Sequence, residues 1–177
     1  MELQVEVNVE DQFWDTEGDG MTQAPISPQI WQLWIQQWLK ILSTDLPPAW
    51  AYELSLCWAG DLTIQALNGQ YRHQDQPTDV LAFAALEVNF PQLSELQQTQ
   101  PLYLGDIIIS VETASRQAQQ QGHSLTTELA WLVAHGCLHL LGWDHPDQES
   151  LNRMMDQQVT LLRTVQLNPK WVNDRSR

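Results

Sequence analysis

Three histidines between His135 and His145 constrain the fold of this chain more than any other feature of its sequence. His135 and His139 are four residues apart, which on a helix places both imidazoles on one face with their Cβ atoms about 6 Å apart. Gly142 suits the left-handed conformation that ends a helix, so the chain turns there and brings His145 back. The spacing predicts one metal ion held by His135, His139 and His145.

Three neutral nitrogens leave one position of a tetrahedral zinc ion open, which is typical of catalytic sites, whereas structural sites usually have four protein ligands. Water bound to such an ion has its pKa lowered to about 7, which favours hydrolysis. The alternative is that these are ordinary core histidines. The leucines of the same segment already fill a core, however, and added buried imidazoles would need partners. We therefore expect a hydrolase with one Zn²⁺ ion.

The residues around the histidines have separate interpretations. Cys137 lies about 200° around the helix from His135 and is not expected to be a ligand. Asp144 either orients an imidazole or bonds its own backbone, and both alternatives stay open. Gly136 costs about 1 kcal/mol in a helix, which indicates a backbone or a substrate passing close by. Glu128, two turns before His135, is expected to cap the helix or to support a metal ligand from behind instead of catalysing.

Hydrophobic periodicity predicts an α+β fold. Alternating residues predict four strands, at 3–9, 52–58, 80–84 and 102–110. Helical spacing and capping residues predict about five helices: one from Ser27 that closes at Pro47-Pro48, one capped by Asp61 and running through Tyr71, and three at 112–120, 124–141 and 148–165. This order suggests helices packed on a mixed four-stranded sheet, with a metal cleft at the C-terminal helices. The length of 177 residues fits a single domain, 1–177.

Composition restricts the classes of function. The chain has 22 acidic and 8 basic side chains, and its formal charge of −14 disfavours loose attraction to a nucleic-acid backbone. No run of apolar residues is long enough for a membrane helix, and the N-terminus lacks the pattern of a secretory signal. Two cysteines fit a reducing compartment, so we expect a cytoplasmic location. His73 and His123 lie in polar segments and are expected at the surface.

The histidine segment resembles the YbeY family of zinc-dependent bacterial endoribonucleases, whose signature is H-G-x-L-H-L-x-G-[YF]-D-H, with Trp143 at the aromatic position. Two further blocks resemble the family, one from Leu67 to Leu81 that includes Tyr71-Arg72 and Pro77-Thr78-Asp79, and one from Leu104 to Ser110. The resemblance covers about residues 55–160. Ala82 departs from the serine that the family has before the phenylalanine.

The resemblance implies an α+β fold with the metal in a cleft and with the three histidines as zinc ligands. It also implies single-strand-specific RNA cleavage in the 3′-end maturation of 16S ribosomal RNA and in late-stage 70S ribosome quality control. The partners would be ribosomal RNA and the ribosome or a ribosome-associated protein, without DNA or a membrane. Arg72 would grip a phosphate, although a structural salt bridge is equally compatible with its sequence position. Turn or strand-end chemistry is sufficient to explain Asp79 and Asp106, and their roles stay open.

Two other functions stay open. His135 to His145 also fits the spacing of metzincin zinc peptidases, but those enzymes have a glutamate as general base where this chain has Gly136. A non-catalytic ribosome assembly factor with a structural zinc is the second alternative. The acidic charge suggests that an RNA-cleaving enzyme of this kind binds RNA mainly when a ribosome or partner protein delivers it.

Overall fold

Four strands form one mixed sheet in the computed structural model, which describes residues 2–14, 23–85 and 100–169. The sheet has the order β1-β2-β4-β3. Neighbouring strands are parallel from β1 to β4, and β3 runs antiparallel to β4 at the edge. The strands are β1 (Val5–Asp11), β2 (Tyr52–Ala59), β3 (Val80–Ala84) and β4 (Leu102–Ser110). The predicted mixed four-stranded sheet is confirmed, and its strand order is new information.

Within the part of the chain that the structure describes, five α-helices accompany the sheet: α1 (Pro28–Ile41), α2 (Asp61–Arg72), α4 (Val111–Gln121), α5 (Leu125–Leu140) and α6 (Gln148–Thr164). Ser27 caps α1 as predicted, but the helix ends at Ile41 and a 3₁₀ turn, Ser43–Asp45, precedes the prolines. The sequence predicted Asp61 as the N-cap of α2, one residue after the observed cap. Gly60 is the N-cap and Asp61 is the first helical residue, where its carboxylate faces the positive end of the helix dipole.

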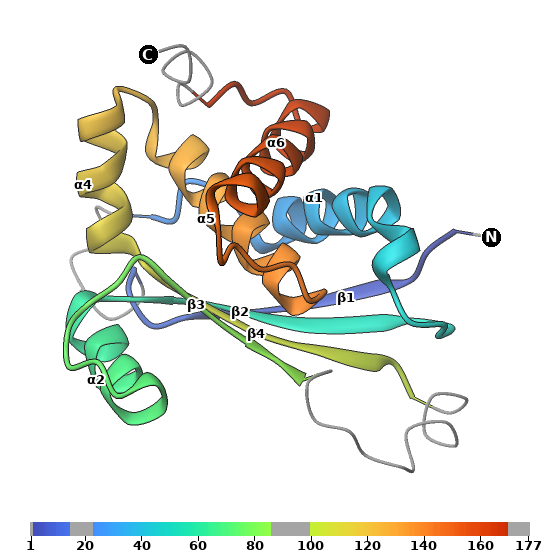
Figure 1. Ribbon diagram of the computed structural model, residues 1–177, viewed down its shortest axis with the longest axis horizontal. Helices are drawn as coiled ribbons and strands as arrows, with labels where there is room; N and C mark the ends of the chain where they lie inside the picture. Colours follow the sequence, from blue (N-terminus) through green and yellow to red (C-terminus); the bar gives the residue numbers. More distant parts are fainter. Residues whose placement is uncertain (1, 15–22, 86–99, 170–177) are drawn as a thin grey trace.

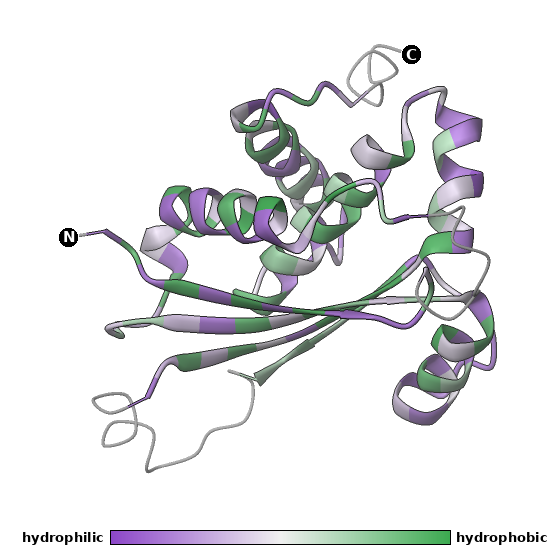
Figure 2. Ribbon diagram, turned by 180° about the vertical axis from the view of Figure 1, so that it is seen from behind, coloured by the Kyte–Doolittle hydropathy of each residue, from purple (hydrophilic) through white to green (hydrophobic). Residues whose placement is uncertain are grey.

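The helices divide between the two faces of the sheet (Figure 1). Helices α1, α5 and α6 cover one face, and α2 lies on the other near one end of the strands. The larger core fills the first layer, where Trp31 and Trp38 of α1 and Trp58 of β2 are fully buried. A smaller cluster of Ile64, Leu81 and Ile108 lies beneath α2. The hydropathy colouring shows this two-sided arrangement from behind (Figure 2).

Gly136 lets α5 approach β4 closely. A Cβ at this position would lie 2.8 Å from Cγ2 of Ile107, closer than side chains tolerate. The expectation that a backbone or a substrate passes Gly136 was therefore wrong, because the neighbour is a buried side chain of the sheet. The contact fixes the height of α5, and of the histidines on it, above the strands. No helix among the described residues is long and apolar enough to span a membrane.

Candidate metal centre

The three predicted histidines meet at the C-terminal end of α5. His135 and His139 lie on the helix, and His145 follows the turn at Gly142, whose φ of +93° lies in the left-handed region. One ring nitrogen from each histidine lies within 4.8 Å of the others, and the Nε2 atoms of His135 and His139 are 3.0 Å apart. The structure thus brings together the side chains that the spacing pointed to, and the group could hold a metal ion.

Burial keeps the two helical histidines in the form that binds metals. Burial lowers the pKa of His135, and the Gln158 side chain opposes this shift only in part. Burial, followed by the neighbouring His135 and His145, lowers the pKa of His139 to about 4. Both imidazoles are therefore neutral at physiological pH, which leaves a nitrogen lone pair available to a cation.

The donor set fits zinc. Zinc–nitrogen bonds of 2.0–2.1 Å place two ligands of a tetrahedral ion about 3.3 Å apart, close to the 3.0 Å between the Nε2 atoms of His135 and His139. Within residues 2–14, 23–85 and 100–169, no fourth cysteine, histidine or carboxylate belongs to the group. Cys137 is buried in the core outside it, as predicted, and burial raises the pKa of its thiol to about 12.

Gln158 supports the centre from the neighbouring helix α6. Its Oε1 lies 3.2 Å from Nδ1 of His135, and its Nε2 donates to the carbonyl of Trp131 at 3.1 Å. No feature of the sequence considered above predicted a role for Gln158. A signal was available, since Gln158 lies one turn after Met154 on the buried face of α6, where an apolar residue would be expected.

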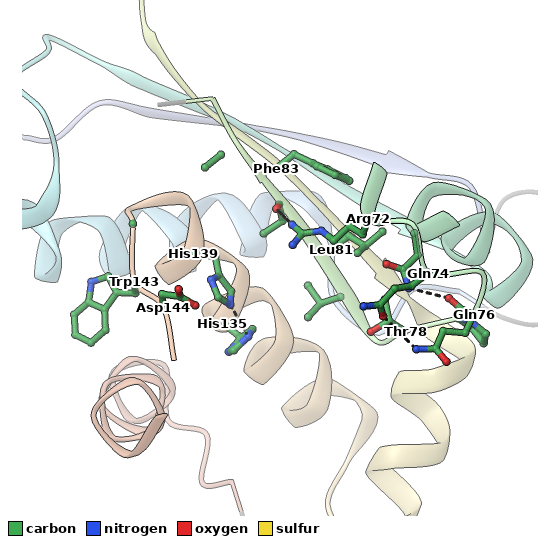
Figure 3. A pocket seen from close by; sticks show the side chains of 16 residues that line it. Arg72, Gln74, Gln76, Thr78, Leu81, Phe83, His135, His139, Trp143 and Asp144 are labelled. Carbon is green, nitrogen blue, oxygen red and sulfur yellow. Dashed lines mark hydrogen bonds between the residues drawn. The ribbon is translucent and has the colours of Figure 1, made fainter. Parts of the chain in front are cut away.

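A groove of about 650 Å³ opens on His135 and His139. His135, His139, Trp143 and Asp144 lie at one end of its lining, and Arg72 with the segment leading into β3 lies toward the other (Figure 3). Strand β3, at the edge of the sheet, forms the wall between them. The indole N–H of Trp143 donates to Oδ2 of Asp45 at 3.3 Å, which ties the end of the groove to the turn after α1. The predicted cleft at the C-terminal helices is therefore present.

Arg72 lies exposed at the end of α2. Its guanidinium donates to the carbonyl of Ala82 at 2.9 Å and stands over the ring of Phe83 at 5.7 Å from the centroid. Because the acceptor is the backbone carbonyl of Ala82, this hydrogen bond does not require the serine that the YbeY-like pattern has at position 82. No carboxylate among the described residues forms an ion pair with Arg72. The salt-bridge alternative thus finds no support there, and the cation lies in the wall of the groove.

The three aspartates that the sequence analysis left open have different surroundings. Asp79 accepts from the Val80 amide at 2.8 Å, a strand-end contact of the kind expected. Asp106 precedes the core-facing Ile107 and so lies on the opposite face of the sheet, where Oδ1 accepts from the Tyr103 hydroxyl at 2.6 Å. Asp144 accepts from the amide of His145 at 2.8 Å, the local turn bond, and also lines the groove.

The predictions for His123 and Glu128 need correction. His123 was expected at the surface, but its side chain is only 3% exposed and contacts the fully buried carboxylate of Glu128 through Nε2. The pair forms because the turn at Gly122 brings His123 against the first turn of α5. Burial raises the pKa of Glu128, although His123 counteracts it. Glu128 therefore supports the start of α5, and Ser124 is the residue that caps it.

This chain is similar to a known protein family and to several of its members. A family model described as "Endoribonuclease YbeY" matches residues 19–166. A relative named "Endoribonuclease YbeY" from a Nostoc strain is 55% identical, covering 94% of this chain and 92% of the relative. Another from Trichodesmium erythraeum is 51% identical and covers 99% and 100%. The similarity therefore extends well beyond the blocks at residues 55–160.

A solved structure shares the fold. The solution structure of TM1509 from Thermotoga maritima matches with a TM-score of 0.54 and 20% sequence identity, covering 98% of this chain and 99% of that chain. At this identity the match supports the α+β architecture alone.

Proposed function

This chain belongs to the YbeY endoribonuclease family, and from that premise we propose that it cuts single-stranded RNA with one zinc ion held by His135, His139 and His145. The reaction class is hydrolysis of internal phosphodiester bonds in RNA. The proposed substrate is ribosomal RNA, in the 3′-end maturation of 16S RNA and in late-stage quality control of the 70S ribosome. These finer assignments follow the family resemblance of the histidine and Arg72 blocks.

One observation carries the proposal: two histidines of the three-histidine group, His135 and His139, line the same groove as Arg72, a cation without a carboxylate partner among the described residues. Zinc bound to the imidazoles would supply Lewis acidity to a phosphoryl oxygen and acidify a coordinated water. Arg72 has five N–H donors, and among the described residues it uses one of them, on Ala82, which leaves the others to bind a phosphate. Phe83 beneath the guanidinium holds it in place by a cation–π contact.

The packing around Gly136 disfavours a metzincin peptidase. In those enzymes the residue after the first histidine is the glutamate that acts as general base. Here a side chain at position 136 would meet Ile107, so this position has no room for a catalytic carboxylate. A structural zinc is disfavoured for a different reason. Such sites usually have four protein ligands, and the histidine group among the described residues has three and borders a groove.

The proposal is tested by metal analysis and RNA cleavage on the same purified proteins. We expect wild type to contain one zinc ion and to cut a single-stranded oligonucleotide faster than the same sequence in a duplex. His139→Ala should lose both zinc and cleavage. Arg72→Ala should retain zinc and lose cleavage by about 100-fold or more, the usual cost of a donor to developing charge. His73→Ala is the matched control, because His73 is exposed and outside the group.

Three results would contradict the proposal. Equal cleavage by all four proteins would identify a contaminating nuclease. Digestion of casein by wild type, absent from His139→Ala, would favour the peptidase. Tightly held zinc in a wild-type protein that cuts no RNA, even with ribosomes present, would favour the assembly factor with a structural metal.

A further inference from the structure

Gln158 is a glutamine on the apolar face of a core helix. It is 1% exposed and shares the buried face of α6 with Met154, Val159 and Leu161. A buried amide costs free energy unless both of its ends are hydrogen-bonded, and an apolar residue would fill this position without that cost. Both ends are in fact bonded, one to the ring of His135 and the other to the backbone of Trp131. The amide therefore joins α6 to the metal-facing end of α5.

The backbone of α5 fixes which way the amide points. The carbonyl of Trp131 has lone pairs and no hydrogen, so it accepts only from the NH₂ end of Gln158, at 3.1 Å. The reverse orientation would set two oxygen acceptors against each other in a buried site. Oε1 of Gln158 consequently faces Nδ1 of His135 at 3.2 Å.

An acceptor opposite Nδ1 determines where the proton of His135 lies. Oε1 of an amide cannot donate, so the contact is a hydrogen bond only if Nδ1 carries the hydrogen. A neutral imidazole has one N–H, which leaves Nε2 with a lone pair. Nε2 is the atom that approaches Nε2 of His139 at 3.0 Å, inside the group that could hold a metal. The chain of contacts thus runs from the Trp131 carbonyl to the ligand atom.

We propose that Gln158 is a positioning residue that holds His135 as the Nδ1–H tautomer and aims its Nε2 lone pair at the metal. Free imidazole side chains favour the opposite tautomer, with the hydrogen on Nε2, which cannot bind a cation through that atom. Gln158 therefore orients the ligand before the metal arrives, as partners of metal-bound histidines do in general. The inference rests on the proposed metal site but does not depend on RNA as the substrate.

Four proteins test the proposal: wild type, Gln158→Met, Gln158→Glu and the control Gln157→Met. A fifth, His135→Ala, serves only to assign the ring signals. Methionine matches the length of glutamine without its hydrogen bonds, and glutamate retains an acceptor for Nδ1–H but cannot donate to Trp131. Gln157 is the preceding residue of α6 and is only half-buried. Two readouts are used. Ring ¹⁵N spectra of the metal-free proteins report the tautomer of His135, and competition with a chromophoric chelator reports zinc affinity.

We expect the wild-type spectrum to show a protonated Nδ1 and an unprotonated Nε2 for His135, assigned by comparison with His135→Ala. Gln158→Met should shift this ring toward the Nε2–H tautomer and weaken zinc binding by about 10–100-fold. Gln158→Glu should restore the wild-type tautomer, which a role in packing alone would not predict. Gln157→Met should match wild type in both measurements.

The proposal is overturned if His135 in metal-free wild type carries its hydrogen on Nε2, or if Gln158→Met binds zinc as tightly as wild type. The first measurement needs no substitution at Gln158, so it decides the question even if Gln158→Met fails to fold. A wild-type protein that binds no zinc would refute the metal site of the proposed function. The tautomer of the metal-free ring would still decide the role of Gln158 separately.

Discussion

Single residues in this protein gain their properties from partners far away in the sequence. Asp61 begins α2, but its carboxylate accepts from the hydroxyls of Ser110 and Thr113 and from the guanidinium of Arg116 at 2.8 Å. Burial alone would raise the pKa of Asp61, and these hydrogen bonds together outweigh it and lower the pKa below the ordinary 3.8. The ionised carboxylate therefore joins α2 to β4 and α4.

Because the pKa of Asp61 is lower in the folded chain than in the unfolded chain, its stabilisation is present above the ordinary pKa. It is lost as the pH falls through the lowered value. We expect Asp61→Asn to reduce the free energy of unfolding at pH 7 by about 1–3 kcal/mol, the range for hydrogen bonds to charged groups. The difference from wild type should shrink in acid, as measured by urea unfolding at several pH values.

Asp75→Asn is the control for this experiment, because Asp75 is exposed and its carboxylate accepts a hydrogen bond from the neutral side chain of Gln65. It should change stability little at any pH. A difference between Asp61→Asn and wild type that stays constant from pH 7 into acid would contradict the role of the charge.

At the scale of helices and strands, the contact between α5 and β4 determines where the histidines lie. Ile107 is fully buried and fills the space that a side chain at position 136 would need. Glycine has poor helix propensity, so its presence one residue after His135 is explained by this close packing. Gly136, which the sequence suggested as a position where a backbone or a substrate passes, is instead the position where α5 packs closely on the sheet.

Gly136→Ala should destabilise the protein by about 1–3 kcal/mol through overpacking, partly offset by the better helix propensity of alanine. The methyl would press on Cγ2 of Ile107, a β-branched side chain that cannot swing away. In the double variant with Ile107→Ala, the loss should be smaller than the sum of the two single losses, measured by chemical unfolding.

Gly142→Ala provides a contrast for this prediction. No atom of the described residues lies within 4 Å of a Cβ there, but the φ of +93° strains any other residue. Its cost should therefore add to that of Ile107→Ala without coupling. Simple additivity for Gly136→Ala as well would show that the contact with Ile107 does not govern the position.

On the scale of the whole molecule, the net negative charge disfavours the RNA binding that the proposed site requires. The formal charge is −14, and one of the eight basic residues, Arg116, is already paired with Asp61. A field of this sign repels a phosphate backbone, and Arg72 with the metal centre would oppose it only inside the groove. We infer that ribosomal RNA reaches the groove on the ribosome or with a partner protein.

The isolated protein should therefore bind a random single-stranded RNA weakly, with a dissociation constant above about 1 μM at roughly 0.15 M salt. Fluorescence anisotropy with a labelled oligonucleotide measures this, using His139→Ala to prevent cleavage. Cosedimentation with purified ribosomes should show tighter association. Nanomolar, salt-resistant binding to random RNA would refute this account.

Much of the fold could be predicted because its signals are local. The caps at Ser27 and Ser124, the alternation in each strand and the one-turn spacing of His135 and His139 are properties of short segments. Elements were therefore placed to within a few residues. The errors, such as the surface position expected for His123, arose where a polar side chain found a distant or unexpected partner.

The sequence by itself determined that two imidazoles leave one helix face and that a third follows a turn, since backbone periodicity alone requires this. Only the tertiary structure decided the strand order, the approach of α5 to Ile107 and the exposure of Arg72 to the histidine groove. It alone also placed Gln158 behind His135. These features depend on how elements pack against each other, and packing is set by the summed contacts of residues far apart in the chain.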